Sequence, residues 1–374
     1  MALTATATKK VKGDIVKSLH MPDCIVFEQS FNRANLYYEV RPKKKSKQLE
    51  EMAQWIQDTY PNRCGIVYCL SQKDCESAAK GLREAGINAG HYHAGMTPSE
   101  RQDTHLRWLN DDVLVICATI AFGMGINKPD VRFVIHHSLP KTLEGYYQEA
   151  GRAGRDGLPA HCVLYYSYAD KMRLQFMISK GRGNADSYDT VREHYGALTR
   201  VVEYCENKTD CRRQLVLTYF DETSFDPTMC NGTCDNCATM TDARVVETDV
   251  TQHIRNLAEL MSSVPARVQL TSNMLLEVYR GSTAKKMVSL GASDFRHFGE
   301  GKTAGLSAAD TERIIHIAVR DGILDERIIG NDYGSCNSYL FLPGNWRSKL
   351  AKPGYRVILK TVKAAGGARG SRAM

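Results

Sequence analysis

The sequence predicts an α/β domain with a parallel sheet covered by helices on both faces, followed by a helical cysteine-bearing subdomain and a winged helix. Three observations lead to this prediction. Short apolar strands alternate with helices between about residues 48 and 180, three cysteines fall within residues 230–237, and a helix–helix–hairpin pattern occupies residues 268–345. Strands of this continuous apolar kind, alternating with helices, are typical of parallel sheets buried on both faces.

The strands and helices of the first domain are indicated by apolar runs and by one clear helix cap. Gly65–Leu70 is a continuous apolar strand, and Ser71 with Asp74 three residues later predicts the N-cap of the following helix. We expect three further strands, at 113–117, 132–136 and 162–166, and three helices, at 48–58, 98–109 and 169–178.

Chemistry in such sheets lies in the loops at the carboxyl ends of the strands. Ser71, His93 and Thr119 fall in loops of this kind, and the run 148–157 falls at such a loop or at a helix entry. We therefore predict that these loops carry the functional residues of the domain.

The run 148–157, QEAGRAGRDG, places Arg152 and Arg155 three residues apart with small residues between them. Both guanidinium groups can approach one anion while the glycines keep the backbone out of the way. The planar fork of arginine suits phosphate, and an arginine supplied across an interface stabilises the charge that develops as a γ-phosphate leaves. Alone, the run is equally consistent with a glycine-rich surface turn that carries two solvated arginines.

Four of the 12 cysteines form a candidate metal site. Four others lie in apolar runs, where a cysteine acts as a small buried hydrophobe: Cys64, Cys69, Cys117 and Cys162. The candidate ligands are Cys211, Cys230, Cys234 and Cys237. Four thiolates without a nearby histidine predict a closed structural Zn²⁺ site. The alternatives are free or oxidisable thiols, and Cys205 instead of Cys211 as the first ligand.

The segment 268–345 predicts a winged helix, which is a helix-turn-helix variant. Its expected elements are helices at 271–280 and 307–321 and strands at 324–329 and 338–342. Arg280, Lys285 and Lys286 follow the first helix and suit DNA phosphates. Tyr333 at the tip of the hairpin either stacks on a base or fills a turn.

The charge distribution gives only a weak nucleic-acid signal. The net charge is +7, but no acidic residue follows Asp332. The cations beyond that point are Arg347, Lys349, Lys352, Arg356, Lys360, Lys363, Arg369 and Arg372. Without them the rest of the chain is nearly neutral, so we interpret 346–374 as a basic disordered tail that contacts phosphates non-specifically. No apolar run approaches the ~20 residues of a membrane span, and no signal peptide precedes the first domain, so we expect an intracellular protein without a membrane partner.

Three motifs occur in a characteristic order: YHAG at 92–95, ATIAFGMGINKPD at 118–130, and the arginine run at 148–157. Together they resemble the second motor lobe of superfamily-2 helicases. With the flanking residues they resemble the RecQ family, and within it the Bloom-syndrome-type helicases most closely, over about residues 1–345. The cysteine segment is also similar to the RecQ pattern, in which the position of Cys211, rather than Cys205, is the ligand.

The resemblance implies a RecA-like fold for the second helicase lobe and ATP-driven 3′-to-5′ DNA unwinding in recombination, repair and replication, with Mg²⁺ as the ATP-bound metal. It implies that Arg155 is the arginine finger and that Arg152 and Gln148 act with it. Gly125 and Asp130 belong to the adjoining nucleotide-binding motif. It also implies a nuclear protein whose partners are single-stranded, forked or junction DNA and recombination or repair proteins. We expect Ser71, His93 and Thr119 to contact that DNA.

The resemblance divides the chain into five parts. We expect the end of the first motor lobe and the interlobe connector at 1–47, the second lobe at 48–180, a helical zinc-binding subdomain at 181–245, the winged helix at 246–345 and the tail at 346–374. The basic run 41–47 within the connector is interpreted as a solvated linker in preference to a localisation signal.

The parts of a helicase that hold ATP and Mg²⁺ are not found in these residues. Nothing fits GxxxxGK[ST], since Gly301-Lys302-Thr303 has Arg296 where the first glycine is required, and no Asp-Glu-x-His box is present. Ala2–Thr8 resembles the motif that closes the first lobe. We therefore expect a RecQ helicase truncated at its N-terminus and unable to hydrolyse ATP alone. The alternative is a non-catalytic DNA-binding protein built from the second lobe, zinc module and winged helix.

Overall fold

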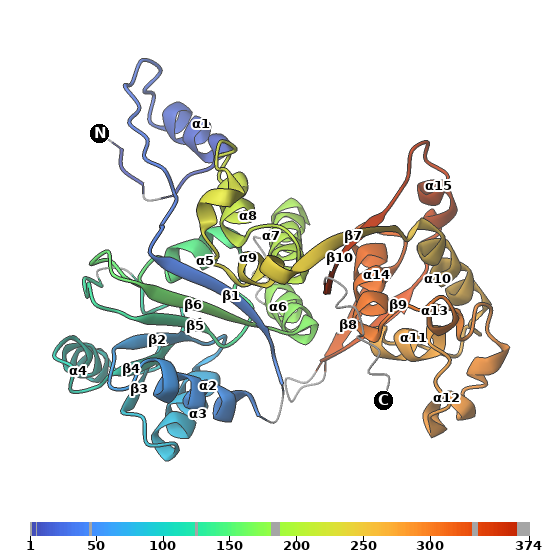
Figure 1. Ribbon diagram of the computed structural model, residues 1–374, viewed down its shortest axis with the longest axis horizontal. Coiled ribbons are helices and arrows are strands. Elements are labelled where there is room, and N and C mark those ends of the chain that lie inside the picture. Colours follow the sequence, from blue (N-terminus) through green and yellow to red (C-terminus); the bar gives the residue numbers. More distant parts are fainter. Residues whose placement is uncertain are drawn as a thin grey trace, which may run out of the picture. The chain divides into compact units, whose positions relative to one another are not determined.

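The computed structural model describes residues 2–4, 6–44, 47–123, 126–180, 188–330 and 336–364 (Figure 1). Contacts divide the chain into two compact units, 1–171 with 188–242 and 172–187 with 243–374, hereafter unit 1 and unit 2. Within the described ranges, no helix combines the length and the apolar character needed to cross a membrane.

Unit 1 is built on a six-stranded sheet with the order β1-β6-β5-β2-β4-β3, in which every pairing is parallel. Its strands are β1 Leu36–Pro42, β2 Gly65–Tyr68, β3 Ala89–Tyr92, β4 Val115–Ala118, β5 Phe133–His136 and β6 Ala160–Tyr166. The predicted parallel sheet is confirmed. The strands β1 and β3 were not expected, because His91 and Tyr92 interrupt the apolar pattern of β3 and β1 lies in the presumed connector.

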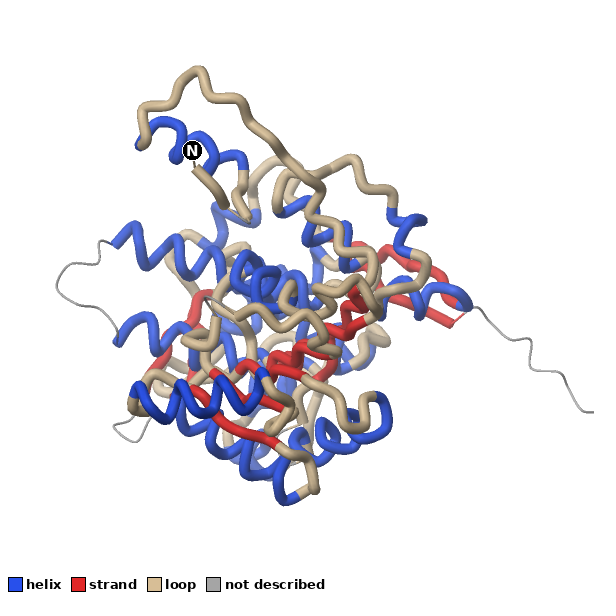
Figure 2. The backbone as a smooth tube through the Cα atoms, turned by 90° about the vertical axis from the view of Figure 1, so that its left-hand side faces the viewer, coloured by secondary structure: helices blue, strands red, loops and turns tan. Residues whose placement is uncertain are grey.

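The helices of unit 1 lie on both sides of this sheet (Figure 1, Figure 2). They are α1 Lys9–Ser18, α2 Gln48–Thr59, α3 Gln72–Glu84, α4 Pro98–Leu109, α5 Leu143–Ala150, α7 Tyr188–Glu206, α8 Arg212–Tyr219, η1 Pro227–Cys230, α9 Asp235–Thr239 and η2 Met240–Asp242, and α6 Tyr168–Lys180 leads into unit 2. α2 and α3 bury Met52, Ile56 and Leu82 against one face. On the other face Tyr146 of α5 packs against Tyr38 and His136.

The helix starts follow the local sequence. Ser71 caps α3 by accepting a hydrogen bond from the amide of Asp74 at 3.2 Å, as predicted. Thr97 and Glu100 form a reciprocal capping box at the start of α4, where Pro98 occupies the first helical position. These caps place Ser71 and the loop after β3 at the carboxyl ends of their strands.

The connector is more ordered than the sequence predicted. Arg41 and Pro42 lie in β1, which pairs with β6 along its whole length. Lys43 is not a solvated linker residue, because its Nζ donates to Ser138 at 2.9 Å and contacts the carboxylate of Asp170 at 3.1 Å. The strand was not predicted because the basic run was interpreted as a linker. The alternating buried positions of β1 begin at Leu36, before the basic residues.

Unit 2 is a winged helix, as predicted. Its elements are β7 Ala243–Asp249, α10 Thr251–Ser263, α11 Ser272–Tyr279, α12 Lys285–Ser289, η3 Ala292–Asp294, α13 Glu300–Thr303, α14 Ala308–Arg320, β8 Asp325–Gly330, β9 Cys336–Phe341, α15 Trp346–Leu350 and β10 Ile358–Ala364. Leu257, Leu275 and Ile315 from the three long helices share one apolar core. β8 and β9 form the antiparallel hairpin, and Leu340 of β9 also pairs with Leu270.

The prediction of a disordered tail from residue 346 is wrong for residues 346–364. α15 follows the hairpin, and β10 pairs antiparallel with β7 over seven residues. Leu350, Val357 and Leu359 are buried in the core of unit 2. Arg356 pairs with Asp249 at 2.7 Å and Lys360 with Glu247 at 3.6 Å, so two cations of this segment are matched by acidic residues more than a hundred positions earlier. Residues 365–374 lie outside the described part of the chain.

Candidate functional site

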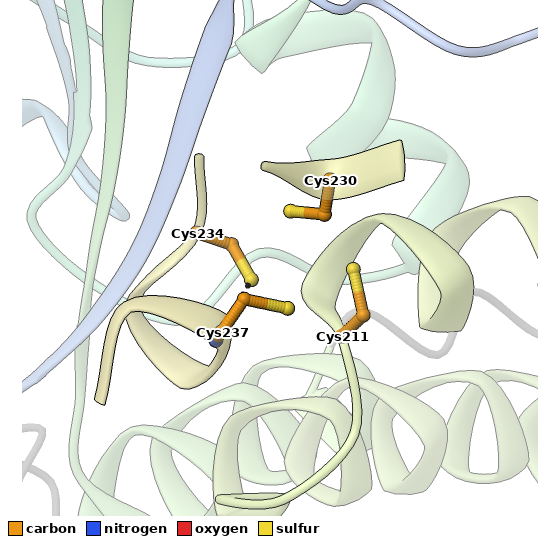
Figure 3. A group of neighbouring side chains, drawn as sticks. All are labelled: Cys211, Cys230, Cys234 and Cys237. Carbon is orange, nitrogen blue, oxygen red and sulfur yellow. Dashed lines mark hydrogen bonds between the residues drawn. The ribbon is translucent and has the colours of Figure 1, made fainter. Parts of the chain in front are cut away.

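Four cysteine side chains converge in unit 1 between α8, η1 and α9 (Figure 3). The Sγ atoms of Cys211, Cys230, Cys234 and Cys237 all lie within 4.8 Å of one another. Cys211 immediately precedes α8, Cys230 ends η1, and the other two flank the start of α9. Asn231 and Gly232 both have positive φ, of 50° and 71°, which turns the chain back between the second and third cysteines. Cys205 lies in α7, outside the cluster, so Cys211 is the first member.

The cluster fits Zn²⁺. Four thiolates at the usual Zn–S length, in tetrahedral geometry, stand about 3.8 Å apart, so only small movements separate these sulfurs from a closed site. A thiolate is already favoured at Cys234, whose pKa is lowered because the Cys211 thiol and the backbone amides of Cys237 and Arg212 donate to it. Burial and the charge of Cys234 raise the pKa of Cys237 to about 12. One thiolate shared among thiols is the proton-bound alternative to metal ligation, and zinc binding would release those protons.

Two buried arginines follow the first zinc ligand. Arg212 forms a two-point ion pair with Asp235, at 2.8 and 3.1 Å, and donates to the carbonyl of Tyr204. Arg213 donates to three backbone carbonyls between residues 33 and 36, and to the Thr233 hydroxyl at 2.9 Å. No role was predicted for these two arginines from the sequence. Their only sequence signal is the position of two arginines directly after a ligand cysteine.

The zinc-binding turn also covers the edge of the sheet. β1 is the outer strand, and the amide of Tyr38 donates to the Thr233 carbonyl at 3.3 Å. The amide of Val40 donates to the Asp235 carboxylate at 3.0 Å. An uncovered edge would leave these backbone groups unpaired. The turn around Cys234 therefore acts as part of the sheet as well as a metal site.

Arg152 and Arg155 lie in a loop, residues 151–157, that follows α5; we call it the arginine loop. Arg155 Nη1 donates to the carbonyl of Ile126 at 2.6 Å. Arg152 lies against Gly123, where an added Cβ would stand 3.2 Å from Nη2 of this arginine. Both arginines thus contact the segment that follows β4. Tyr92 of the YHAG motif packs on Phe122 of the same segment, with ring centroids 4.8 Å apart, so the structure brings all three sequence motifs together.

The arginine loop follows a helix, so the prediction that the run 148–157 lies after a strand or at a helix entry is wrong for its backbone, although the Arg152 side chain reaches Gly123 after β4. The loop leaves the C-terminal end of α5, and the amide of Gly154 donates to the carbonyl of Val131 just before β5. The last turn of α5 still reaches the carboxyl end of β5 through Glu149 and His136, and the loop after it passes the start of that strand at Val131.

Arg152 and Arg155 lie near each other, and the hydrogen-bonding capacity of Arg152 is not fully used within the part of the chain that the structure describes. Nε of Arg152 is buried and has no hydrogen-bond partner among the described residues. Burial, together with the positive charges of Arg152 and Arg33, lowers the pKa of Arg155 below its usual value. Cations crowded in this way, with an unused donor, favour a bound anion.

A network of side chains at the ends of β2 and β5 lies beside the arginines. His136 is buried, and its Nε2 donates to Glu149 of α5 at 2.7 Å. Its ring stacks on Tyr68 at 5.5 Å, and the Tyr68 hydroxyl donates to the carbonyl of Phe122 at 2.9 Å. Burial raises the pKa of Tyr68, while the nearby Arg152 opposes that rise. Sequence reasoning missed Tyr68 and His136, although each is a polar residue that ends an apolar strand.

The other residues predicted to act on the nucleotide are Gln148, Asp130 and Gly125, and the two that the structure describes have different partners. The amide of Gln148 donates to the Thr6 hydroxyl at 2.7 Å, which joins α5 to the N-terminal segment. The carboxylate of Asp130 contacts Lys128 at 3.4 Å and lines a cavity of about 680 Å³ at the amino ends of the strands. Gly125 lies outside the described residues. The nucleotide roles of these three residues remain predictions.

The predicted DNA contacts of unit 1 lie along one edge of the sheet. Ser71, His93 and Thr119 follow β2, β3 and β4, which are neighbouring strands, so they share the carboxyl edge. His93 is buried, and its Nε2 donates to Glu76 at 3.2 Å while Nδ1 has no partner within the described ranges. Ile120, next to Thr119, is 62% exposed. The three predicted residues therefore lie in one row at the carboxyl edge, next to one exposed apolar side chain, while the Ser71 hydroxyl is engaged by Asp74 at 2.7 Å and the His93 ring is buried.

In unit 2 the predicted phosphate contacts differ in exposure. Lys285 and Lys286 are exposed at the start of α12. Arg280 is half-buried and donates to the carbonyl of Leu306, so it also holds the loop before α14. Tyr333 lies outside the described residues. Of Arg280, Lys285 and Lys286, the two lysines are therefore the exposed ones.

Three family models match consecutive parts of the chain. A helicase conserved C-terminal domain matches 43–157, a RecQ zinc-binding domain matches 168–238, and an RQC domain matches 244–364. The first match contains both arginines of the loop, and the second contains all four cysteines. The third ends at the last residue of β10, which agrees with the ordered C-terminal strand.

Curated relatives agree with these matches. The chain is 43% identical to ATP-dependent DNA helicase Q-like 4B of Arabidopsis thaliana, covering 96% of this chain and 32% of the relative. It is 43% identical to ATP-dependent DNA helicase hus2/rqh1 of Schizosaccharomyces pombe, covering 92% and 25%. It is 38% identical to ATP-dependent DNA helicase Q1 of Mus musculus, covering 98% and 53%. The chain thus spans between a quarter and about half of the length of these relatives.

A RecA-like lobe with paired arginines, joined to a four-cysteine zinc site and a winged helix, defines a region of a DNA helicase. The zinc-binding and RQC matches and the relatives identify that region further: the chain is a helicase region of the RecQ family.

Proposed function

We propose that this chain supplies the second motor lobe, zinc module and winged helix of an ATP-dependent helicase that unwinds DNA in the 3′-to-5′ direction. The observation that carries the proposal is the arginine loop, in which Arg152 keeps a buried, unpartnered Nε beside Arg155. Such arginines stabilise the charge on a γ-phosphate as it transfers. In this proposal Arg155 is the arginine finger and Arg152 contacts the nucleotide.

ATP with Mg²⁺ would bind between this lobe and a first motor lobe. The sequence has no GxxxxGK[ST] run to cradle the phosphates, so this chain contributes the arginines and Gln148 but not the metal-binding carboxylates. Turnover therefore requires a first lobe supplied with it. Within the same proposal, Gly125 and Asp130 support the nucleotide from the segment after β4.

DNA is the proposed substrate, bound by two parts of the chain. The carboxyl edge with Ser71, His93 and Thr119 suits a single strand, because these residues follow three neighbouring strands and so lie in one row. Lys285 and Lys286 of the winged helix suit the phosphates of a duplex. A strand and a duplex together describe forked or junction DNA. We propose work in recombination, repair and replication, hence a nuclear location and partners among recombination and repair proteins.

ATP turnover tests the proposal directly. The chain alone should show no DNA-stimulated hydrolysis, whereas the chain fused behind the first lobe of the Schizosaccharomyces pombe relative should hydrolyse ATP. In that fusion, Arg155→Lys should lower kcat by about 10³-fold and leave the KM for ATP nearly unchanged, since the finger acts on the transition state. Arg107→Lys, on the exposed side of α4, is the matched control. Full turnover by the Arg155→Lys fusion would contradict the proposal.

The second candidate is a non-catalytic DNA-binding protein. The absence of a phosphate-binding loop and of an Asp-Glu-x-His box from the 374 residues favours it. It predicts that the fusion remains without ATP turnover although both lobes fold, and that the affinity for forked DNA is the same with and without ATP. An ATP-dependent change in affinity in the fusion would exclude this candidate.

A further inference from the structure

Arg33 holds the backbone of the arginine loop. Its guanidinium donates to three carbonyls of that loop, those of Gly151 at 3.1 Å, Ala153 at 3.0 Å and Gly154 at 2.9 Å. Gly154 has a φ of +56°, and an added Cβ would stand 2.5 Å from Nδ2 of Asn35. One planar fork therefore fixes a tight turn whose neighbouring side chains are the two functional arginines.

Arg33 is in turn held by the zinc module, residues 188–242. Arg213 Nη1 donates to the Arg33 carbonyl at 2.6 Å and to Asn32 Oδ1 at 3.1 Å. Arg213 is 3% exposed and stands two residues after the ligand Cys211. Its Nη2 donates to the hydroxyl of Thr233, which itself donates to the carbonyl of the ligand Cys230 at 2.5 Å. Hydrogen bonds thus connect the ligand Cys230 to Thr233, Thr233 to Arg213, and Arg213 to the backbone of Arg33, whose side chain binds the arginine loop.

The start of the same stretch is clamped as well. Phe31 stacks on Phe220 of the zinc module at 4.7 Å and meets Tyr147 of α5 edge-on at 5.9 Å. The Tyr147 hydroxyl donates to the Phe31 carbonyl at 2.6 Å, and Glu222 accepts from the Phe31 amide at 2.9 Å. Residues 31–36 are therefore bound on one side to the zinc module and on the other to α5 and its loop.

We propose that the zinc module sets the position of the arginine loop through residues 31–36, with Arg33 as the positioning residue for Arg152 and Arg155. Zinc ligation fixes Cys211 and the turn at Thr233, and so fixes the two anchors of Arg213. When the metal leaves, Arg213 loses its fixed frame, residues 31–36 shift, and Arg33 no longer spans the three carbonyls. The consequence for catalysis rests on the proposed function, but the mechanical link does not.

Amide hydrogen exchange of the whole chain tests this link without any ATP. Zinc chelation should speed exchange about tenfold in peptides from 31–36 and from 151–155, in addition to the zinc module itself. Arg33→Ala with zinc bound should speed exchange in 151–155 by a similar factor and leave 230–237 protected. Chelation of Arg33→Ala should then add little in 151–155. Arg33→Lys, which keeps the charge but lacks the fork, should resemble Arg33→Ala.

Two controls keep the test decisive. Arg83→Ala removes an arginine of α3 that also donates to a backbone carbonyl, that of Ala89 at 2.9 Å, and should leave 151–155 unchanged. Peptides from β2 report global unfolding. If chelation exposes β2 as well, the zinc-bound Arg33→Ala protein alone decides, because its metal site is intact.

The inference is overturned if chelation loosens 230–237 and 31–36 but leaves 151–155 protected, or if zinc-bound Arg33→Ala exchanges like the parent chain in 151–155. Either result would leave the ATP-turnover test of the proposed function untouched. Conversely, a failed turnover test would leave the exchange result valid as a property of the fold.

Discussion

Two pairs of arginines in unit 1 differ in how their donors are used. Arg212 and Arg213, beside the zinc ligands, are 0% and 3% exposed. Arg212 pairs with the carboxylate of Asp235, and Arg213 donates to backbone carbonyls and side-chain oxygens. Arg155 donates to one backbone carbonyl, that of Ile126, and Nε of Arg152 has no partner in the described part of the chain.

The difference arises from how two carboxylates are paired, one just before the arginine loop and one within it. Glu149 is paired with His136 at 2.7 Å, and Asp156 is paired with Arg132 at 2.6 Å. Both carboxylates are thus engaged by residues other than Arg152 and Arg155, so neither carboxylate is paired with the two arginines. A buried guanidinium with all its partners inside the protein stabilises the fold, whereas one with a donor left over is available to a ligand. Counting arginines in the sequence cannot separate these two uses.

The largest effect should come from removing the zinc ion next to Arg212 and Arg213. Cys234→Ser should abolish the single bound zinc and unfold the zinc module, because thiolate ligation contributes directly to folding free energy. Cys205→Ser is the matched control, since Cys205 is equally buried but lies outside the cluster. It should keep one zinc per chain. Metal analysis and the soluble fraction measure both. A zinc-free but stable Cys234→Ser chain would contradict this prediction.

The next effect separates the two pairs directly. Arg213→Ala should lower the free energy of unfolding of unit 1 by about 3 kcal/mol, because it leaves several buried carbonyls without donors. Arg152→Ala should change that free energy by less than about 0.5 kcal/mol, because the unpartnered donor disappears with the side chain. Urea denaturation of both variants provides the measurement. Equal losses in the two variants would mean that the pairs do not differ as proposed.

How far the sequence predicts this structure depends on whether the signal is local. Cys230, Cys234 and Cys237 lie close together in the chain, and the buried strand β2 is continuously apolar, so both were predicted from short windows. The cap at Ser71 was predicted for the same reason. These elements need only their neighbours in sequence to be recognised.

Elements that depend on distant partners were missed. β10 looked like a disordered tail because its cations have no acidic neighbour, yet Lys360 faces Glu247 of β7 at 3.6 Å. Arg33 gave no signal, because its three acceptors are backbone carbonyls more than a hundred residues away. Backbone acceptors leave no trace in amino-acid type. Long-range pairing and side chain-to-backbone bonds are therefore the parts that sequence patterns could not supply.

The exposed lysines of α12 in unit 2 extend the comparison from buried to solvent-exposed cations. The double variant Lys285→Ala/Lys286→Ala should weaken binding of forked DNA and reduce the slope of log affinity against log salt by about 1.8, or about 0.9 for each lost phosphate contact. Arg296→Ala/Lys302→Ala removes the same charge from other exposed positions of unit 2 and is the control. A salt titration that gives equal slopes for the two double variants would remove α12 from the DNA surface.

The smallest expected effect concerns His297, whose positive charge is paired with carboxylates and is lost at high pH. Burial acts to lower the pKa of His297, but its hydrogen bonds to Glu259 at 2.9 Å and Glu300 at 2.5 Å outweigh burial and raise that pKa above the usual value. The ion pairs therefore stabilise unit 2 fully below about pH 6.5, the unfolded pKa of histidine, and this stabilisation is lost as the pH rises through the folded pKa.

The variant His297→Asn tests this pH dependence, because asparagine tolerates the positive φ of 59° at this position. The gap in urea midpoint between wild type and His297→Asn should be larger at pH 6 than at pH 8.5. His253, whose pKa burial lowers, titrates in both proteins and so cancels from the comparison. A gap that is constant or grows with pH would show that the two carboxylates do not hold His297 as a cation, and the rule drawn from the arginine pairs would not extend to histidine.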